Sequence, residues 1–202
     1  MKLRRIYVLG SANMDLVFAL DRLPHAGETR TGGDLALYPG GKGANQACTA
    51  SKLGGRTTFV ARVGDDAFGS RLLASLSEAG VDVSRVAKSK RATGCACIYV
   101  LPNGDNSIVI SPGANAALDA QSAVADVADI GVGDILLAQL ETPIESVQAA
   151  FVYAKSRGAT TMLDPAPARR VPRELLEAID YTTPNETEAA MLTGRRTSGS
   201  PR

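Results

Sequence analysis

The sequence predicts an α/β protein built around a mostly parallel sheet. The short apolar run at residues 6–9 stops at Gly10, which is typical of a buried parallel strand. From residue 114 onward, short apolar strands alternate with segments of helical periodicity, as in βαβ units. Between these regions, residues 94–101 and 107–111 are rich in β-forming residues and flank a Pro-Asn-Gly-Asp-Asn turn, which predicts a hairpin.

The remaining elements follow from apolar periodicity and from the positions of glycine and proline. Residues 16–39 alternate loosely and hold several turn residues, so we expect antiparallel strands and loops there rather than a helix. Further strands are expected at residues 57–63, 134–140, 160–163 and 181–183. Helices are expected at residues 44–51, 68–79, 119–128, 144–157, 174–179 and 185–192.

Two local predictions depend on side-chain chemistry. Thr142, Pro143 and Glu145 combine an N-cap residue, a proline at the first helical position and a capping-box glutamate. Cys95 and Cys97 lie on one face of the first hairpin strand. We expect them to be buried thiols that pack as small apolar groups rather than metal ligands.

Composition describes an ordinary globular chain and excludes several functions. The 202 residues are 45% hydrophobic and 21% charged, and the net charge of +1 gives no electrostatic reason to expect nucleic acid as a partner. The three cysteines form no metal-binding or paired-disulfide spacing, which favours a reducing compartment. Because no stretch approaches about 18 apolar residues, we expect no membrane span and a cytoplasmic protein.

A glycine-rich stretch, Gly40-Gly41-Lys42-Gly43-Ala44-Asn45-Gln46-Ala47, precedes the first expected helix. Glycine lets backbone N–H groups approach a ligand closely, and a helix starting here would point its free N–H groups into the same space. Lys42 and Asn45 would add side-chain donors. The alternative is a tight strand-to-helix turn without a ligand. The stretch is neither a P-loop nor a dinucleotide fingerprint, since Gly43 stands where a P-loop has Ser or Thr.

Polar residues follow several of the expected strands. In a parallel sheet, ligands bind beyond the carboxyl ends of the strands, so these residues are expected to converge on one edge. Asn13 and Asp15 would also share a face in extended chain and could hold adjacent hydroxyls of a sugar. Glu141 is not needed as a helix cap if Thr142 fills that position, which favours a functional role. The converging residues are Asn13, Asp15, Glu141, Asp164 and Asn185.

Several of these stretches, in order along residues 5–194, resemble the ribokinase-like sugar and nucleoside kinases of the phosphofructokinase-B family. The matching motifs are Gly10-Ser11-Ala12-Asn13-Met14-Asp15, Gly40–Ala47, Gly64-Asp65-Asp66, Gly113–Leu118, Gln139-Leu140-Glu141, Asp164–Ala168 and Thr183–Glu188. The resemblance implies a three-layer α/β/α kinase domain over residues 1–194. It also implies a small β-sheet lid from residues 12–18, 30–39 and 94–111, through which the family forms homodimers.

The resemblance also assigns roles by position. It implies that the sugar hydroxyls are bound by Asn13, Asp15, Gly41, Lys42, Asn45 and Glu141. Asn185 would approach the phosphates of ATP, and Glu188 would help to place Mg²⁺ through water. A monovalent cation such as K⁺ is a further implied cofactor. The reaction implied is transfer of the ATP γ-phosphoryl group to the O5 hydroxyl of D-ribose, in which positioning and charge stabilisation dominate.

One family signature does not occur in these 202 residues. The Gly-Ala-Gly-Asp turn, whose aspartate is the family's catalytic base, is absent, so the base is expected beyond Arg202 and the fold is expected to be incomplete at the C-terminus. Losing such a base costs about 10²- to 10⁴-fold in rate, so little turnover is expected from this chain alone. Residues 195–202 are expected to be a disordered tail.

Two alternative functions stay open at this point. Another family kinase, such as a fructokinase or nucleoside kinase, could use the same sugar-binding residues. A non-catalytic sugar-binding remnant or partner subunit is the alternative outside the enzymes.

Overall fold

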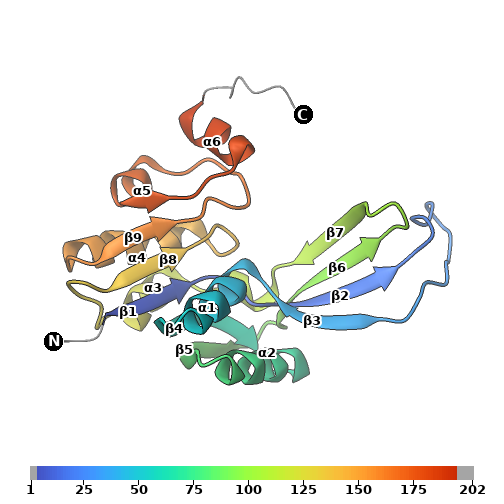
Figure 1. Cartoon of the computed structure of the whole chain (residues 1–202), viewed down its shortest axis with the longest axis horizontal. Helices are drawn as coiled ribbons and strands as arrows, with labels where there is room; N and C mark the ends of the chain where they lie inside the picture. Colours follow the sequence, from blue (N-terminus) through green and yellow to red (C-terminus); the bar gives the residue numbers. More distant parts are fainter. Residues whose placement is uncertain (1–3, 195–202) are drawn as a thin grey trace.

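The computed structural model describes residues 4–194 and contains two sheets (Figure 1). The larger sheet has six strands in the order β10-β9-β8-β1-β4-β5, and each neighbouring pair is parallel. Its strands are β1 (Arg5–Leu9), β4 (Arg56–Gly64), β5 (Asp82–Ser89), β8 (Ile135–Ala138), β9 (Thr160–Leu163) and β10 (Tyr181–Thr182). The smaller sheet has four strands in the order β3-β2-β6-β7, which are β2 (Asn13–Ala19), β3 (Ala36–Gly40), β6 (Gly94–Val100) and β7 (Asn106–Ser111).

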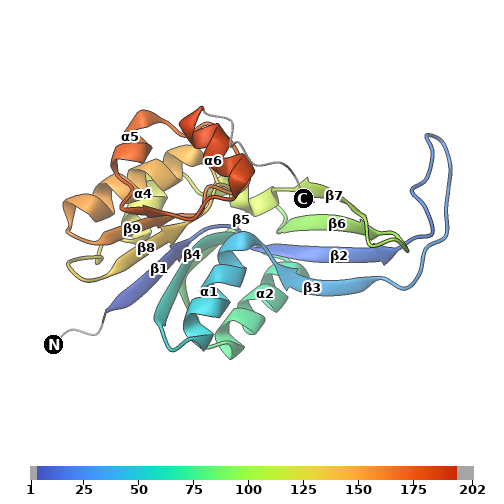
Figure 2. The ribbon, with the colours of Figure 1, turned by 45° about the horizontal axis from the view of Figure 1, so that its top comes forward.

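Helices cover both faces of the larger sheet (Figure 2). The helices are α1 (Lys42–Lys52), α2 (Ala67–Glu78), α3 (Ala120–Asp126), α4 (Ile144–Ser156), α5 (Arg173–Glu177) and α6 (Glu186–Thr193), and a 3₁₀ turn, η1, spans Gly113–Ala117. Successive side chains in a strand point to opposite faces, so β1 places Val8 in one core and Leu9 in the other. This arrangement confirms the expected parallel sheet flanked by helices.

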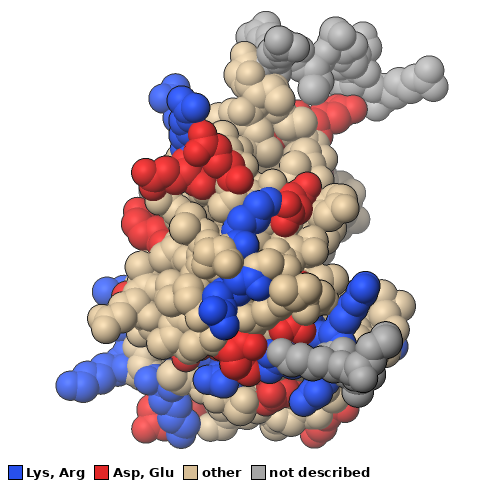
Figure 3. All heavy atoms as spheres, turned by 90° about the vertical axis from the view of Figure 1, so that its left-hand side faces the viewer, with Lys and Arg blue, Asp and Glu red and all other residues tan. Residues whose placement is uncertain are grey.

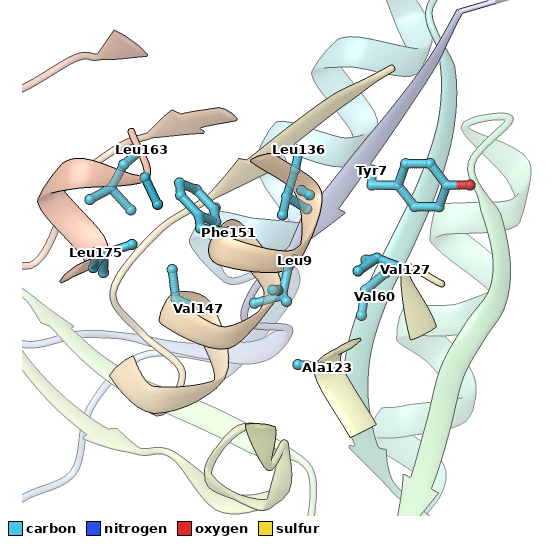
Figure 4. Packing of buried hydrophobic residues seen from close by; sticks show 14 of the residues in the cluster. Tyr7, Leu9, Val60, Ala123, Val127, Leu136, Val147, Phe151, Leu163 and Leu175 are labelled. Atoms are coloured by element: carbon cyan, nitrogen blue, oxygen red, sulfur yellow. The ribbon is translucent and has the colours of Figure 1, made fainter. Parts of the chain in front are cut away.

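The two cores differ in their helices. Val8 and its neighbours on β4 pack against α1 and α2, where Ala47, Leu72 and Leu76 are buried. On the opposite face, Leu9 packs with residues of α3, α4 and α5, and Figure 4 shows Phe151 of α4 between Leu136 of β8 and Leu163 of β9. The central strands of the larger sheet are therefore buried on both faces, which explains their continuous apolar sequences.

The smaller sheet projects from the larger one because β1 leads almost directly into β2 (Figures 1 and 2). β2 pairs in parallel with β6 and in antiparallel with β3, and β6 forms the expected hairpin with β7. β6 and β7 fall within the range of residues 94–111 expected for a lid, whereas β2 and β3 each extend one residue past their expected ranges, to Ala19 and Gly40. Residues 30–35 are loop, and β3 begins only at Ala36. The lid role and the grouping of the chain into one kinase domain stay predictions, and the expected tail lies outside the described residues.

Two local expectations are wrong. Pro143, not Thr142, occupies the N-cap of α4, no side chain caps that helix, and the buried Thr142 Oγ1 has no hydrogen-bond partner. Cys95 and Cys97 are only half-buried, because Gly94 and Ala96 take the buried face of β6.

Strand β5 was not expected from the sequence. It lies at the edge of the sheet and alternates exposed with half-buried residues, so its apolar pattern is weak.

Charges of both signs are spread over the molecular face at the left-hand side of Figure 1, as the space-filling view shows (Figure 3). At the amino end of β1, Arg5 pairs with Asp129 and with the buried Asp134. Within residues 4–194, no helix is both long enough and apolar enough to cross a membrane.

Candidate sugar site

Helix α1 starts against the carboxyl end of β1, and glycine makes this close approach possible. Gly41 has a φ of +92°, and a Cβ there would lie 2.8 Å from the backbone N of Asn13. A Cβ on Gly43 would lie 2.6 Å from the backbone C of Gly10 and the backbone N of Ser11. Contacts this short do not occur between real atoms, so only glycine fits. The N-terminus of α1 is thereby held directly over the strand end.

A carboxylate from the loop that follows β8 joins this junction. Glu141 Oε2 accepts a hydrogen bond from Ser11 Oγ at 2.5 Å and another from the backbone N–H of Lys42 at 3.2 Å. Gly41, the N-cap of α1, provides no side-chain cap, so Glu141 supplies the acceptor that the first turn lacks. Oε1 of Glu141 receives no hydrogen bond from the described residues and is free to accept one from a ligand.

Asp15 faces the same space from β2. A Cβ on Gly40 would lie 2.2 Å from Asp15 Oδ2, so the carboxylate lies directly against this glycine. Burial, and then the negative charge of Glu141, raise the pKa of Asp15. The two carboxylates are therefore close enough to repel each other, and hydroxyl donors between them would relieve that repulsion.

Asn13, two residues before Asp15, is held by η1. It is buried, and its Oδ1 accepts a hydrogen bond of 2.7 Å from Asn115 Nδ2. The Nδ2 group of Asn13 makes no hydrogen bond with the described residues. Asn13 therefore offers a donor beside the acceptor of Asp15.

A second polar chain links α1 to the end of β9. Gln139 Nε2 donates to Gln46 Oε1, and Gln46 Nε2 donates to Asp164 Oδ2 at 2.8 Å. Burial raises the pKa of Asp164, the charge of Glu188 adds to this, and the Lys42 ammonium opposes it. Lys42 and Glu188 therefore both lie near Asp164, on the same edge of the sheet.

Asn185 and Glu188 form a capping box at the start of α6. Asn185 Oδ1 accepts from the backbone N–H of Glu188 at 2.8 Å, and Glu188 Oε2 accepts from the backbone N–H of Asn185 at 2.9 Å. Glu188 Oε1 also accepts from Asn185 Nδ2 at 3.0 Å, and Glu188 is buried whereas Asn185 is exposed. Both predicted residues thus have a structural role in α6.

The structure brings together most of the residues predicted to bind the sugar, along with Asp164, which was expected only at the same edge of the sheet. Contacts or charge interactions connect the following residues at the carboxyl ends of β1, β8 and β9: Asn13, Asp15, Gly41, Lys42, Glu141 and Asp164. Asn45 is exposed on α1, and its side chain makes no hydrogen bond with the described residues. Its backbone N–H donates to the carbonyl of Gly41, and its carbonyl accepts from Thr49 Oγ1.

Sequence reasoning missed four polar residues that hold this site together: Ser11, Gln46, Asn115 and Gln139. Gln139 gave a signal, because it interrupts an otherwise apolar strand segment and is fully buried. The side-chain partners of the other three are 32 or more residues away along the chain, although Gln46 itself lies in the glycine-rich stretch. No local pattern marks such contacts.

Comparisons with known proteins agree with this geometry. The model of the pfkB family of carbohydrate kinases matches residues 3–200. The ribokinase of Haemophilus influenzae is 41% identical over 192 residues, which are 95% of this chain and 63% of that protein. The Bacillus subtilis ribokinase is 40% identical over 190 residues, which are 94% of this chain and 65% of that protein.

A solved structure gives the same result. The structure of Arabidopsis thaliana ribokinase complexed with ribose and ATP matches with a TM-score of 0.88 and 35% identity, over 97% of this chain and 65% of that one. The chain thus spans just under two-thirds of the length of these relatives. The fold, the order of the motifs and the family match agree, and the chain belongs to the pfkB family of carbohydrate kinases.

Proposed function

We propose that this chain carries the sugar-binding part of an ATP-dependent kinase that phosphorylates D-ribose at O5. The observation that carries the proposal is the meeting of Asp15, Glu141 and Asn13 at the start of α1. The similar Arabidopsis thaliana ribokinase is described as complexed with ribose and ATP, which supports both substrates for this chain.

The polar groups suit a polyhydroxylated ligand. A hydroxyl group both donates and accepts, and the site offers acceptors on Asp15 and Glu141 and a donor on Asn13. Lys42 and Asn45, on the first turn of α1, could approach the same ligand. Binding in this arrangement would hold the reacting hydroxyl in place, which is the main protein contribution to phosphoryl transfer.

The nucleotide would lie toward α6. Asn185 is exposed at the N-terminus of that helix, where free N–H groups and the helix dipole favour phosphate. Among residues 4–194, no group of three His, Cys, Asp or Glu side chains could hold a metal. Mg²⁺ commonly binds through substrate phosphates and water, so Glu188 fits an outer role near it. The binding of a monovalent cation such as K⁺ stays a prediction.

The smaller sheet supports a homodimer through the lid. Cross-strand pairing places Tyr38 opposite Asp15 and Ile110 opposite Ala96, so these residues share the face that carries the sugar site. Tyr38, Ile108 and Ile110 are each more than half exposed, and an exposed apolar face of this kind marks an interaction surface. A second copy of the chain is the partner we propose. Sedimentation analysis with Ile110→Asp should then show a monomer.

Calorimetric titration of the folded chain with D-ribose tests the proposed substrate. We expect saturable binding that weakens about 10- to 100-fold in Asp15→Ala, because hydrogen bonds to a charged group contribute about 1.5–3 kcal/mol. Asp105→Ala is the matched control, since Asp105 lies in the exposed turn between β6 and β7 and should leave binding unchanged.

A panel of 2-deoxyribose, fructose and a nucleoside separates the alternatives. Tighter binding of fructose or the nucleoside than of ribose would replace ribose with that substrate. A folded chain that binds none of these ligands would contradict the proposed sugar site itself.

A further inference from the structure

Asn115 occupies an unusual position between the two sheets. Ala12 lies in the short connection between β1 and β2, where its backbone groups belong to neither sheet. Asn115 Oδ1 accepts from the backbone N–H of Ala12 at 2.9 Å, and Asn115 Nδ2 donates to the carbonyl of Ala12 at 3.3 Å. The side-chain amide thus replaces the missing strand partner at this buried break in the chain.

These backbone contacts fix which way the Asn115 amide points. A backbone N–H can only donate and a carbonyl can only accept, so Oδ1 must face the N–H of Ala12 and Nδ2 must face its carbonyl. The other proton of Asn115 Nδ2 is then directed at Asn13, and the distance from Asn115 Nδ2 to Asn13 Oδ1 is 2.7 Å. Asn13 is 4% exposed and Asn115 is 1% exposed, so water cannot easily replace either group.

We propose that Asn115 is a positioning residue that determines the hydrogen-bonding character of Asn13 toward the sugar. Because Oδ1 of Asn13 is held by Asn115, its Nδ2 is the group presented to the ligand. Asn13 then acts as a donor, while Asp15, on the same face of β2, acts as an acceptor. This inference rests on the proposed sugar kinase function and adds a determinant of specificity to it.

The consequence is a directional pattern for two adjacent hydroxyls. One hydroxyl oxygen accepts from Asn13, and a proton of the pair is donated to the carboxylate of Asp15. A site that pairs polar groups in this way rejects an analogue lacking the hydroxyl, because a buried donor is then left unpaired. Sugars with a deoxy position at this hydroxyl should therefore bind worse than ribose, and the loss should depend on Asn115.

Gly94 gives independent evidence that the pair is closely constrained. A Cβ at residue 94 would lie 2.3 Å from Asn115 Nδ2 and 2.4 Å from Asn13 Oδ1. The amide pair therefore lies directly against the first residue of β6, and only glycine leaves room for it.

A double-mutant cycle on ribose affinity tests the proposal. Asn115→Asp keeps the acceptor for the Ala12 N–H but puts an oxygen against both the Ala12 carbonyl and Asn13 Oδ1. The Asn13 amide should therefore turn over and present its oxygen to the sugar. We expect Asn115→Asp and Asn13→Ala each to weaken D-ribose binding about 10-fold, and the double variant to be no weaker than the single ones. Asn103→Asp adds the same charge in the exposed β6–β7 turn and should not change affinity.

The outcome separates positioning from a purely structural role. Losses that multiply in the double variant would mean that Asn115 acts independently of Asn13, which would overturn the proposal. If Asn115→Asp does not fold, Gly94→Ala serves instead, since it displaces the same amide pair and should lose its effect in the Asn13→Ala background.

A readout without ribose distinguishes this proposal from the proposed function. In a chain labelled with ¹⁵N-asparagine, the side-chain amide resonances of Asn13 should shift in Asn115→Asp. A shift in a chain that binds no sugar would support the positioning and reject the sugar assignment. An unchanged resonance would reject the positioning whatever the chain binds.

Discussion

Replacing Gly43 with alanine tests how closely α1 must approach β1. A Cβ on Gly43 would lie 2.6 Å from two backbone atoms, the C of Gly10 and the N of Ser11. No side chain can rotate away to relieve this contact. Since nonbonded atoms prefer separations of about 3.5–4.0 Å, the start of α1 would have to move outward by roughly 1 Å.

That movement would weaken the contacts that fix the helix. Overpacking costs about 1–3 kcal/mol, and each of the hydrogen bonds from Ala44 N to Ser11 O and from Lys42 N to Glu141 is worth about 1 kcal/mol. Alanine gains about 1 kcal/mol over glycine within a helix. We therefore expect a net loss of about 2–4 kcal/mol in the free energy of unfolding.

Urea denaturation followed by circular dichroism measures this loss. Gly131→Ala is the matched control, because a Cβ there would meet nothing within 4 Å, and its stability should change by less than about 0.5 kcal/mol. If Gly43→Ala is as stable as this control and binds D-ribose normally, the close helix–strand junction has no role in the fold or in the site.

Two further changes test the electrostatics and the capping. Burial and the charge of Glu141 raise the pKa of Asp15, so the folded state holds this proton more tightly than the unfolded chain, and the ionised carboxylate destabilises the fold above that pKa. Asp15→Asn should therefore raise the free energy of unfolding at pH 7 and lose this advantage as the pH falls through the raised pKa, while it weakens ribose binding. An equal change in the free energy of unfolding at all pH values would refute this. Asn185→Ala removes the side-chain cap of α6 and should lower the local stability of that helix by about 0.5–2 kcal/mol, which faster amide hydrogen exchange in α6 would reveal. The control Thr187→Ala, at an exposed neighbouring position, should leave the exchange rates in α6 unchanged.

Much of the fold could be predicted because its signals are local. The apolar runs of β1 and β8 and the hairpin turn between β6 and β7 depend on residues that are neighbours in sequence. The capping box of Asn185 and Glu188 lies at the start of the expected helix at residues 185–192, although only its metal and nucleotide roles were anticipated. By contrast, Thr142 has every local feature of an N-cap residue and is not one.

The site was only partly predictable for the same reason. Asp15 and Glu141 were expected at one edge of the sheet because both follow strands, and the structure brings their charges together. The reason given for Glu141 was wrong, since it depended on a cap by Thr142. Its actual partners, Ser11 and the N–H of Lys42, are about 100 or more residues away in the chain.

The sequence by itself determined the strand and helix periodicity, the glycines at the start of α1 and the family motifs, because these depend on residue type and short spacing. Only the tertiary structure decided that Glu141 completes the first turn of α1 and that Asn115 holds Asn13. A hydrogen bond forms between whichever groups the fold leaves buried side by side, and sequence spacing does not limit that choice.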